Sequence, residues 1–263
     1  MNMLDIPYDE VVVTGCSYSC GMEMNDHLLS KFSNEDERKI AVWKWGKENL
    51  KLSGKNITDI ETISNSHWVA LEQQNSWPAL LQEKLQIPVT NLSMKGASTG
   101  HSLITYSEFL KKVDKDKKIL AIHQLPYMGR MYIRFDKEHG RIAILPSHAE
   151  SKSTFGFARD YFQEKIDRVH RIYKHRVMSE GYIKKHYWKV LDRLNVLSTK
   201  NQIKNFYMFP SEKATPMSAS FSCNVILKDF KDFRSNYSEG ILGHPNGKSF
   251  NNDLCELIIT TCL

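Results

Sequence analysis

Residues 10–19 read EVVVTGCSYS, and the expected fold follows from this stretch. It begins with a short apolar run, rich in β-branched residues, that stops at Gly15. Such a run is typical of a strand buried on both faces of a parallel sheet. Two side chains able to act as nucleophiles, Cys16 and Ser17, follow the glycine. The stretch therefore predicts a buried strand and a tight turn that carries either a helix cap or a nucleophile.

Helix and strand patterns alternate downstream of this first strand. SWPALLQEKLQI (76–87) predicts a helix, because Ser76 can cap it and Pro78 lies in its first turn. Further patterns predict a strand at PVTNLS (88–93), a turn and helix over 94–113, strands at ILAIHQL (119–125) and NFYMF (205–209), and a closing helix in 251–263. This order predicts an α/β protein: a three-layer α/β/α sandwich with a central parallel sheet of the flavodoxin-like kind.

Several segments stand apart from the predicted sheet. Residues 129–146 alternate around a turn and predict a β-hairpin. Residues 31–73 lie inside the first strand–helix–strand unit and predict an insertion or lid. Residues 156–200 predict a helical elaboration, which Gly181 is expected to divide into two helices. We expect one domain over residues 1–263, and we find no clear period in the polar, serine-rich stretch 211–243.

The composition favours a soluble protein of the reducing cytoplasm. Its 263 residues, 41% of them hydrophobic, suffice for one large domain. No apolar run reaches the length of about 20 residues that spans a bilayer, and the N-terminus lacks the pattern of a signal peptide. The five cysteines are scattered and odd in number, and no second pair has the spacing of a zinc site. We therefore expect no disulfide framework, no metal, no other cofactor and no membrane partner.

Polar residues follow several of the predicted strands at their carboxyl ends. Ser17 follows the first strand, Gly96 and Ser98 follow the second, and His123 and Gln124 end the third. The C-terminal stretch GHPNGK (243–248) is a further polar segment. Ligands of open parallel sheets bind beyond the carboxyl ends of the strands, so the sequence predicts a functional site at this edge.

Four blocks in this order resemble the SGNH or GDSL-type hydrolases, in particular a divergent branch common in phage and bacterial genomes. The blocks are GCSYS (15–19), SWPALLQEKL (76–85), NLSMKGAS (91–98) and GHPN (243–246). They are spread over nearly the whole chain. The resemblance implies an SGNH-like α/β/α fold and a serine-dependent ester hydrolase or acyltransferase, which acts on a small or carbohydrate-linked acyl group through an acyl-Ser17 intermediate.

The resemblance also implies roles for individual residues. Ser17 would be the nucleophile and His244 its base, since a serine hydroxyl attacks well only when a base takes its proton. The backbone N–H groups of Ser17 and Gly96 would form the oxyanion hole, and Gln124 or a near neighbour stands where the family usually places an asparagine. Substrate contacts would come from Ser98, His123, Arg130 and Asn246.

One departure from the family pattern keeps a second interpretation open. Ile241 stands where the family usually has its acid. A backbone carbonyl or a remote acid such as Glu239 or Asp253 would therefore have to hold His244, or the site is a weak dyad or inactive. Ser17 can equally be a helix cap, His244 a turn histidine and Arg130 a surface side chain. The alternative function is a catalytically impaired binding or assembly protein of phage type that contacts nucleic acid or another polyanion. Its basic surface would be a cluster over 168–176, which a solvated helix explains equally well.

Overall fold

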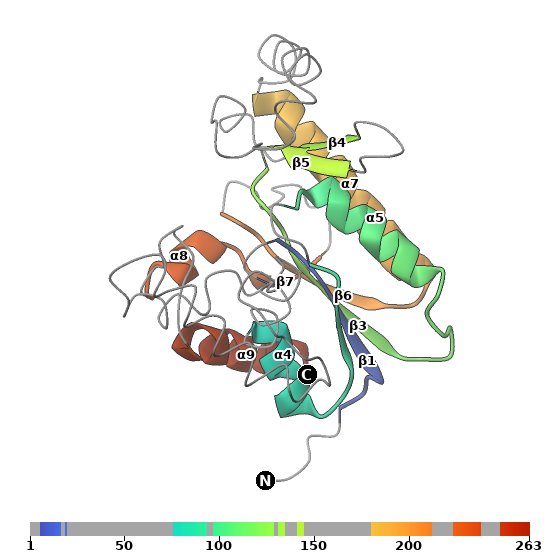
Figure 1. The fold of residues 1–263 in the computed structure, drawn as a ribbon, viewed down its shortest axis with the longest axis vertical. Helices are drawn as coiled ribbons and strands as arrows, with labels where there is room; N and C mark the ends of the chain where they lie inside the picture. The colour runs from blue at the N-terminus through green and yellow to red at the C-terminus, as the bar shows by residue number, and fades with distance from the viewer. Residues whose placement is uncertain are drawn as a thin grey trace, which may run out of the picture.

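A five-stranded parallel sheet forms the centre of the protein in the computed structural model (Figure 1). The structure describes residues 6–16, 19, 76–93, 97–128, 131–134, 141–144, 180–211, 223–237 and 248–263. The sheet has the order β2-β1-β3-β6-β7, which is the flavodoxin-like order with the first strand inside the sheet. Its strands are β1 (Glu10–Thr14), β2 (Val89–Asn91), β3 (Ile119–Gln124), β6 (Lys204–Met208) and β7 (Asn224–Leu227).

Helices cover both faces of this sheet, as Figure 1 shows. On one face lie α4 (Trp77–Leu85), α8 (Phe230–Arg234) and α9 (Lys248–Cys262), and on the other lie α5 (Thr99–Leu110) and α7 (Glu180–Lys200). Successive residues of β1 alternate between the two layers: Val11 and Val13 pack toward α4 and α9, whereas Val12 packs toward α5 and α7. Burial on both faces explains why the strand is a continuous apolar run. The predicted three-layer α/β/α fold is confirmed.

Helices α4 and α5 begin where the sequence predicts. Ser76 is the N-cap of α4, and Pro78 occupies its first turn, where a missing backbone N–H costs nothing. The α4 side chains Trp77 and Leu81 are fully buried against the sheet and α9. The N-cap of α5 is Ser98, whose hydroxyl accepts a hydrogen bond from the backbone N–H of His101 at 3.2 Å.

The long helix α7 lies in the C-terminal half of the helical elaboration predicted over 156–200. Tyr187, Leu191 and Leu194 are buried and face the sheet. Gly181 lies in the first turn of α7, and a Cβ added there would meet no other atom of the described residues within 4 Å beyond its own stretch of helix. The remainder of the expected elaboration, residues 156–179, falls outside the described residues.

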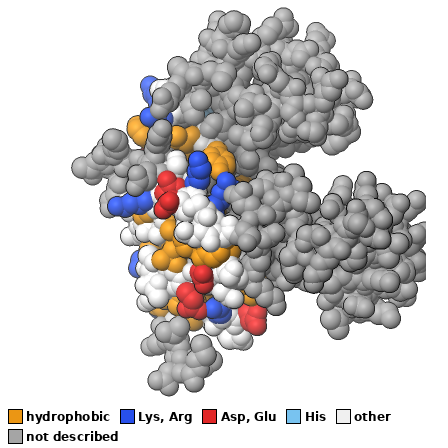
Figure 2. Space-filling model, turned by 90° about the vertical axis from the view of Figure 1, so that its left-hand side faces the viewer, with side chains coloured by type: hydrophobic (Ala, Val, Ile, Leu, Met, Phe, Trp, Pro, Cys, Tyr) orange, Lys and Arg blue, Asp and Glu red, His pale blue; other side chains and the backbone are white. Residues whose placement is uncertain are grey.

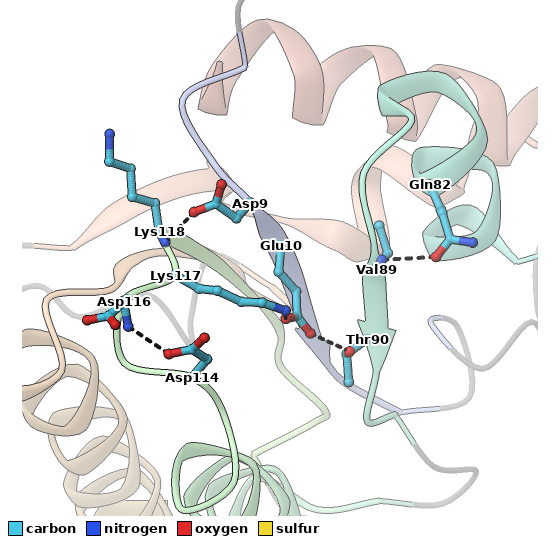
Figure 3. Close-up of polar contacts among 9 residues, drawn as sticks. All are labelled: Asp9, Glu10, Gln82, Val89, Thr90, Asp114, Asp116, Lys117 and Lys118. Carbon is cyan, nitrogen blue, oxygen red and sulfur yellow. Dashed lines mark hydrogen bonds and ion pairs between the residues drawn. The ribbon is translucent and has the colours of Figure 1, made fainter.

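Side-chain contacts connect the strands at their amino ends (Figure 3). The Glu10 carboxylate accepts a hydrogen bond from the Thr90 hydroxyl at 2.7 Å and pairs with Lys117 at 3.0 Å. Lys117 has its pKa raised, chiefly by the hydrogen bond to Glu10. At the start of β2, the Gln82 side-chain oxygen accepts the Val89 N–H at 2.9 Å. These bonds join β1 to β2 and to the loop before β3, and so support the register of the three strands.

Two further segments, the hairpin and the stretch 211–243, can be compared with the sequence predictions. The predicted hairpin is present as β4 (Met131–Arg134) paired antiparallel with β5 (Arg141–Ile144). In contrast, the stretch 211–243 is not irregular throughout, because it contains the edge strand β7 and the short helix α8. The expected insertion over 31–73 lies outside the described residues, so the domain boundaries stay predictions. Among the described helices, none is both long and apolar enough to cross a membrane.

Candidate functional site

The carboxyl ends of β1, β2 and β3 meet around the turn that follows β1. Thr14, the last residue of β1, pairs with His123 of β3, and Val13 pairs with Asn91, the last residue of β2. Within the turn, Cys16 and Ser19 form hydrogen bonds to side chains of these neighbouring strands. Ser17, the predicted nucleophile, lies in the chain between Cys16 and Ser19 and is itself outside the described residues.

The Gln124 side chain is the centre of these contacts. Its carbonyl oxygen Oε1 lies 3.3 Å from the backbone nitrogen of Cys16, 3.3 Å from Cys16 Sγ and 3.1 Å from Ser19 Oγ. The Cys16 backbone N–H can only donate, so the acceptor facing it must be the amide oxygen and not the NH₂ group. The NH₂ group donates to the Leu125 carbonyl at 3.3 Å. Gln124 is 1% exposed, so water does not compete for these bonds.

Asn91 holds the same turn from the other side. Its Nδ2 donates to the Ser19 carbonyl at 2.8 Å, and its Oδ1 accepts the Ser93 backbone N–H at 3.0 Å. The side chain therefore links the turn after β1 to the chain that leaves β2. Together, Gln124 and Asn91 bond to the residues on both sides of Ser17 in the sequence.

Gly15 is required by the close packing of this turn. A Cβ atom at this position would lie 2.5 Å from Ser19 Oγ, 2.9 Å from Ser19 Cβ and 3.0 Å from Gln124 Oε1. The first two distances are shorter than non-bonded atoms tolerate. The glycine that the sequence places after β1 is thus explained by the approach of Ser19 and Gln124.

A small pocket lies beside the turn, with a volume of about 10 Å³. That is room for about one water molecule. Most of its wall is apolar, and its lining consists of Cys16, Gln124, Leu125, Pro126, Tyr127, Pro210 and Phe230. Cys16, 2% exposed, packs into the core on the side of α4 and α9.

His123 occupies a different environment from its neighbour Gln124. It is completely buried, with its ring 4.9 Å from that of Tyr106 and 5.2 Å from that of Tyr207. Its Nδ1 lies 2.9 Å from Thr14 Oγ1, whereas no hydrogen-bond partner of Nε2 lies in the described part of the chain. Burial lowers the pKa of His123 to about 3, so the imidazole is neutral near pH 7. The structure places this expected substrate ligand in the core beneath α5 and α7.

The other predicted site residues divide into two groups. Ser98 is fully buried and serves as the N-cap of α5. Outside the described residues lie Ser17, Gly96, Arg130, His244 and Asn246, together with Glu239, the insertion and the basic cluster over 168–176. Their roles stay predictions. Asp253, the other acid considered for orienting His244, lies on α9 and accepts a hydrogen bond from the Tyr237 hydroxyl at 2.7 Å.

Asn91 and Ser19 were not among the residues that the sequence singled out. Both nevertheless fall within blocks used for the resemblance: Asn91 begins NLSMKGAS, and Ser19 ends GCSYS. The clue would have been that the two strands flanking β1, β2 and β3, each end in an amide side chain, Asn91 and Gln124. What the sequence does not show is that both side chains turn toward the same loop.

The described residues hold no evident metal site. No three His, Cys, Asp or Glu side chains gather among them in an arrangement that could hold a metal ion. A hollow of about 500 Å³ lies at the amino ends of the strands, and lysines outnumber acids in its lining, which includes Lys115, Lys117, Lys118, Lys200, Lys204, Asp114 and Asp116. On the face in Figure 2, basic and acidic side chains are interspersed. The hollow lies at the opposite end of the strands from Gln124.

Comparison with known proteins gives distant structural similarities, among them the three that follow. No family model and no curated protein matches the chain. A member of the lipolytic protein G-D-S-L family from Veillonella parvula is 8% identical, with a TM-score of 0.43 over 96% of this chain and 97% of that one. TesA is 9% identical, with a TM-score of 0.34 over 96% and 97%. A putative lipolytic protein of the G-D-S-L family from Desulfitobacterium hafniense is 12% identical, with a TM-score of 0.32 over 96% and 99%. At these scores the similarities do not bear on activity or substrate.

Proposed function

We propose that the protein is a serine-dependent ester hydrolase or acyltransferase that acts on a small or carbohydrate-linked acyl group. The observation that carries the proposal is the hydrogen bonding of Cys16 and Ser19, on either side of Ser17, to one buried oxygen of Gln124. This turn lies at the carboxyl edge of the sheet, where ligands of open α/β sheets bind. The four sequence blocks that resemble SGNH hydrolases support the same assignment.

The proposed reaction proceeds through a covalent intermediate. His244 takes the proton of the Ser17 hydroxyl as its oxygen bonds to the ester carbonyl carbon, and the carbonyl oxygen becomes an oxyanion. The backbone N–H groups of Ser17 and Gly96 stabilise that charge. The carbon–oxygen bond to the alcohol then breaks, and His244 returns the proton to the alcohol. Water or a second hydroxyl takes the acyl group from Ser17 by the same steps in reverse.

The small pocket beside the turn supports an acyl group of short length. Its volume of about 10 Å³, room for about one water molecule, and its wall of Leu125, Pro126, Tyr127, Pro210 and Phe230 leave no space for a long acyl chain in this pocket. This feature favours acetyl esters, free or carried on a sugar, over esters of fatty acids.

A fluorophosphonate probe, which bonds to activated serine hydroxyls, tests the proposal. We expect labelling of the intact protein, with loss of labelling in Ser17→Ala and a large decrease in His244→Ala. Ser235→Ala is the matched control, because Ser235 is exposed at the end of α8 and its hydroxyl donates to the Asp232 carbonyl. Labelling should persist in that variant. A folded wild-type protein that is not labelled would refute the proposal.

A second candidate function rests on the residues before His244. Ile241, Leu242 and Gly243 provide no carboxylate at the position where the resemblance implies one. A binding or assembly protein that keeps this fold without catalysis would need none. Absence of labelling together with a stable fold is the result that this candidate predicts.

A further inference from the structure

The turn after β1 is held by side-chain amides from both strands that flank β1. Gln124 reaches it from β3 and bonds to Cys16 and Ser19, and Asn91 reaches it from β2 and bonds to the Ser19 carbonyl. Ser19 is the shared residue, since its hydroxyl binds one amide and its carbonyl binds the other. Ser19 is completely buried and Gln124 nearly so.

Gln124 acts in these contacts through its oxygen. Three donor atoms lie within 3.3 Å of Oε1, namely Cys16 N, Cys16 Sγ and Ser19 Oγ. In a buried site, removing the common acceptor leaves the Cys16 N–H without this partner, which costs more than an average hydrogen bond. One NH₂ proton is used by the Leu125 carbonyl, and that bond orients the amide so that its oxygen faces the turn.

The position of this turn matters for catalysis because it determines the position of the nucleophile. A nucleophile must lie within a fraction of an ångström of its productive position, and a displacement of about 1 Å can lower a rate by about a hundredfold. Ser17 is separated from the two bonded residues by one or two peptide units, so the position of the turn determines where its backbone starts. Loosening Cys16 and Ser19 therefore moves the nucleophile without touching substrate.

We propose that Gln124 and Asn91 are positioning residues that hold the nucleophile turn, with Gln124 acting as a hydrogen-bond acceptor. This inference rests on the proposed function, in which Ser17 is the nucleophile. It gives Gln124 a role different from an oxyanion donor, because a donor would act through the NH₂ group. The two roles predict opposite results for substitutions that keep or remove the acceptor oxygen.

Two substitutions of Gln124 separate these roles. Gln124→Met keeps the length of the side chain and removes the acceptor oxygen. Gln124→Glu keeps an acceptor oxygen and removes the amide donor. The matched control is Gln82→Met, since Gln82 also accepts a backbone N–H through its side-chain oxygen, but at the opposite edge of the sheet. Thermal unfolding of each variant shows whether it is folded.

The first readout is amide hydrogen exchange of Cys16, which needs no catalysis. We expect Gln124→Met to speed exchange at Cys16 by about tenfold or more, as loss of a buried acceptor implies. Gln124→Glu keeps the acceptor but loses the bond from the NH₂ group to the Leu125 carbonyl, so it should speed exchange less than Gln124→Met does. Gln82→Met should leave exchange unchanged. Unchanged exchange in a folded Gln124→Met protein would overturn the inference.

The second readout is the rate of fluorophosphonate labelling, with kcat and KM for p-nitrophenyl acetate. Gln124→Met should lower the labelling rate and kcat by about tenfold to a hundredfold while KM changes little, and Gln124→Glu should recover part of the loss, because it keeps the acceptor oxygen but not the bond to the Leu125 carbonyl. Equal impairment in both variants would assign Gln124 to oxyanion binding and overturn the positioning role.

Two other outcomes are a Gln124→Met protein that does not fold and a wild-type protein that is not labelled. If Gln124→Met fails to fold, Ser19→Ala takes its place, because it removes one donor to Gln124 with a loss of one oxygen atom. It should raise exchange at Cys16 and lower labelling by a few-fold, and no change in either would overturn the inference. If the wild-type protein is never labelled, the proposed function fails, and the exchange measurement alone decides whether Gln124 holds the turn.

Discussion

We predict that the protein loses stability markedly in mild acid because His123 is buried. It is completely buried between Tyr106 and Tyr207, and burial lowers its pKa from 6.5 to about 3. The other described contact of its ring is with the Thr14 hydroxyl, which cannot balance a positive charge. The unfolded chain therefore binds a proton at this residue several pH units before the folded protein does.

The size of the effect follows from proton linkage. The folded-state pKa is lower than the unfolded value, so the contribution of His123 is complete above about pH 6.5 and is lost as the pH falls toward 3. Each pH unit within this window lowers the free energy of unfolding by about 1.4 kcal/mol. From pH 7.5 to pH 4.5 the loss from this residue alone is about 3 kcal/mol.

Urea unfolding of wild type and His123→Phe across pH 4.5 to 7.5 (about half-unit steps) measures this contribution. Phe keeps an aromatic ring in the core but does not titrate, so the variant should lack the loss assigned to His123. His186→Phe is the control, because His186 is exposed on α7 and its pKa is lowered less severely, by partial burial and by Lys189 and Arg193. If the free energy of unfolding falls with pH as steeply in His123→Phe as in wild type, His123 does not make this contribution.

Three further substitutions have defined outcomes. Gly15→Ala places a Cβ within 2.5 Å of Ser19 Oγ, and should lower the free energy of unfolding by about 1 to 3 kcal/mol and abolish fluorophosphonate labelling. Unaltered labelling would contradict the packing described for the turn. Tyr127→Ala opens the pocket beside Gln124 and should raise kcat/KM for p-nitrophenyl butyrate relative to the acetate; an unchanged ratio would separate this pocket from the acyl group. Leu191→Ala leaves a cavity under α7 and should cost about 2 to 5 kcal/mol in urea unfolding, whereas a cost near zero would place Leu191 outside the core.

The central sheet was predictable because its strands are strongly patterned. Val11, Val12 and Val13 form an unbroken β-branched run, and the structure buries all three completely. Ser76 and Pro78 marked the start of α4 in the same way. Signals of this kind are local, so they are present in a single sequence.

The stretch from 211 to 243 shows where local signals fail. Strand β7 has only four residues, Asn224–Leu227, and just one of them, Ile226, is buried. It forms because its backbone pairs with β6 at the edge of the sheet, with a change of register between Tyr207 and Met208. That pairing comes from the rest of the fold and not from the propensity of the strand.

The position of Gln124 at the carboxyl ends of the strands was predictable, but its contacts were not. Parallel topology placed Gln124 at the same edge as the turn after β1, where the structure finds it. Topology did not separate Gln124 from His123, although alternation along a strand sends neighbouring side chains to opposite faces. Gln124 therefore meets Cys16 and Ser19, whereas His123 meets Tyr106 and Tyr207.

The most direct test of Ser17 as the nucleophile is to trap the proposed acyl-enzyme. The protein is mixed with p-nitrophenyl acetate, quenched in acid and digested, and the peptide that contains residues 11–24 is sequenced by tandem mass spectrometry. We expect an acetyl group on the Ser17 hydroxyl, absent from Ser17→Ala and much reduced in His244→Ala. An acetyl group on Cys16 or Ser19, or an unmodified peptide from a folded protein that turns over the ester, would contradict this expectation.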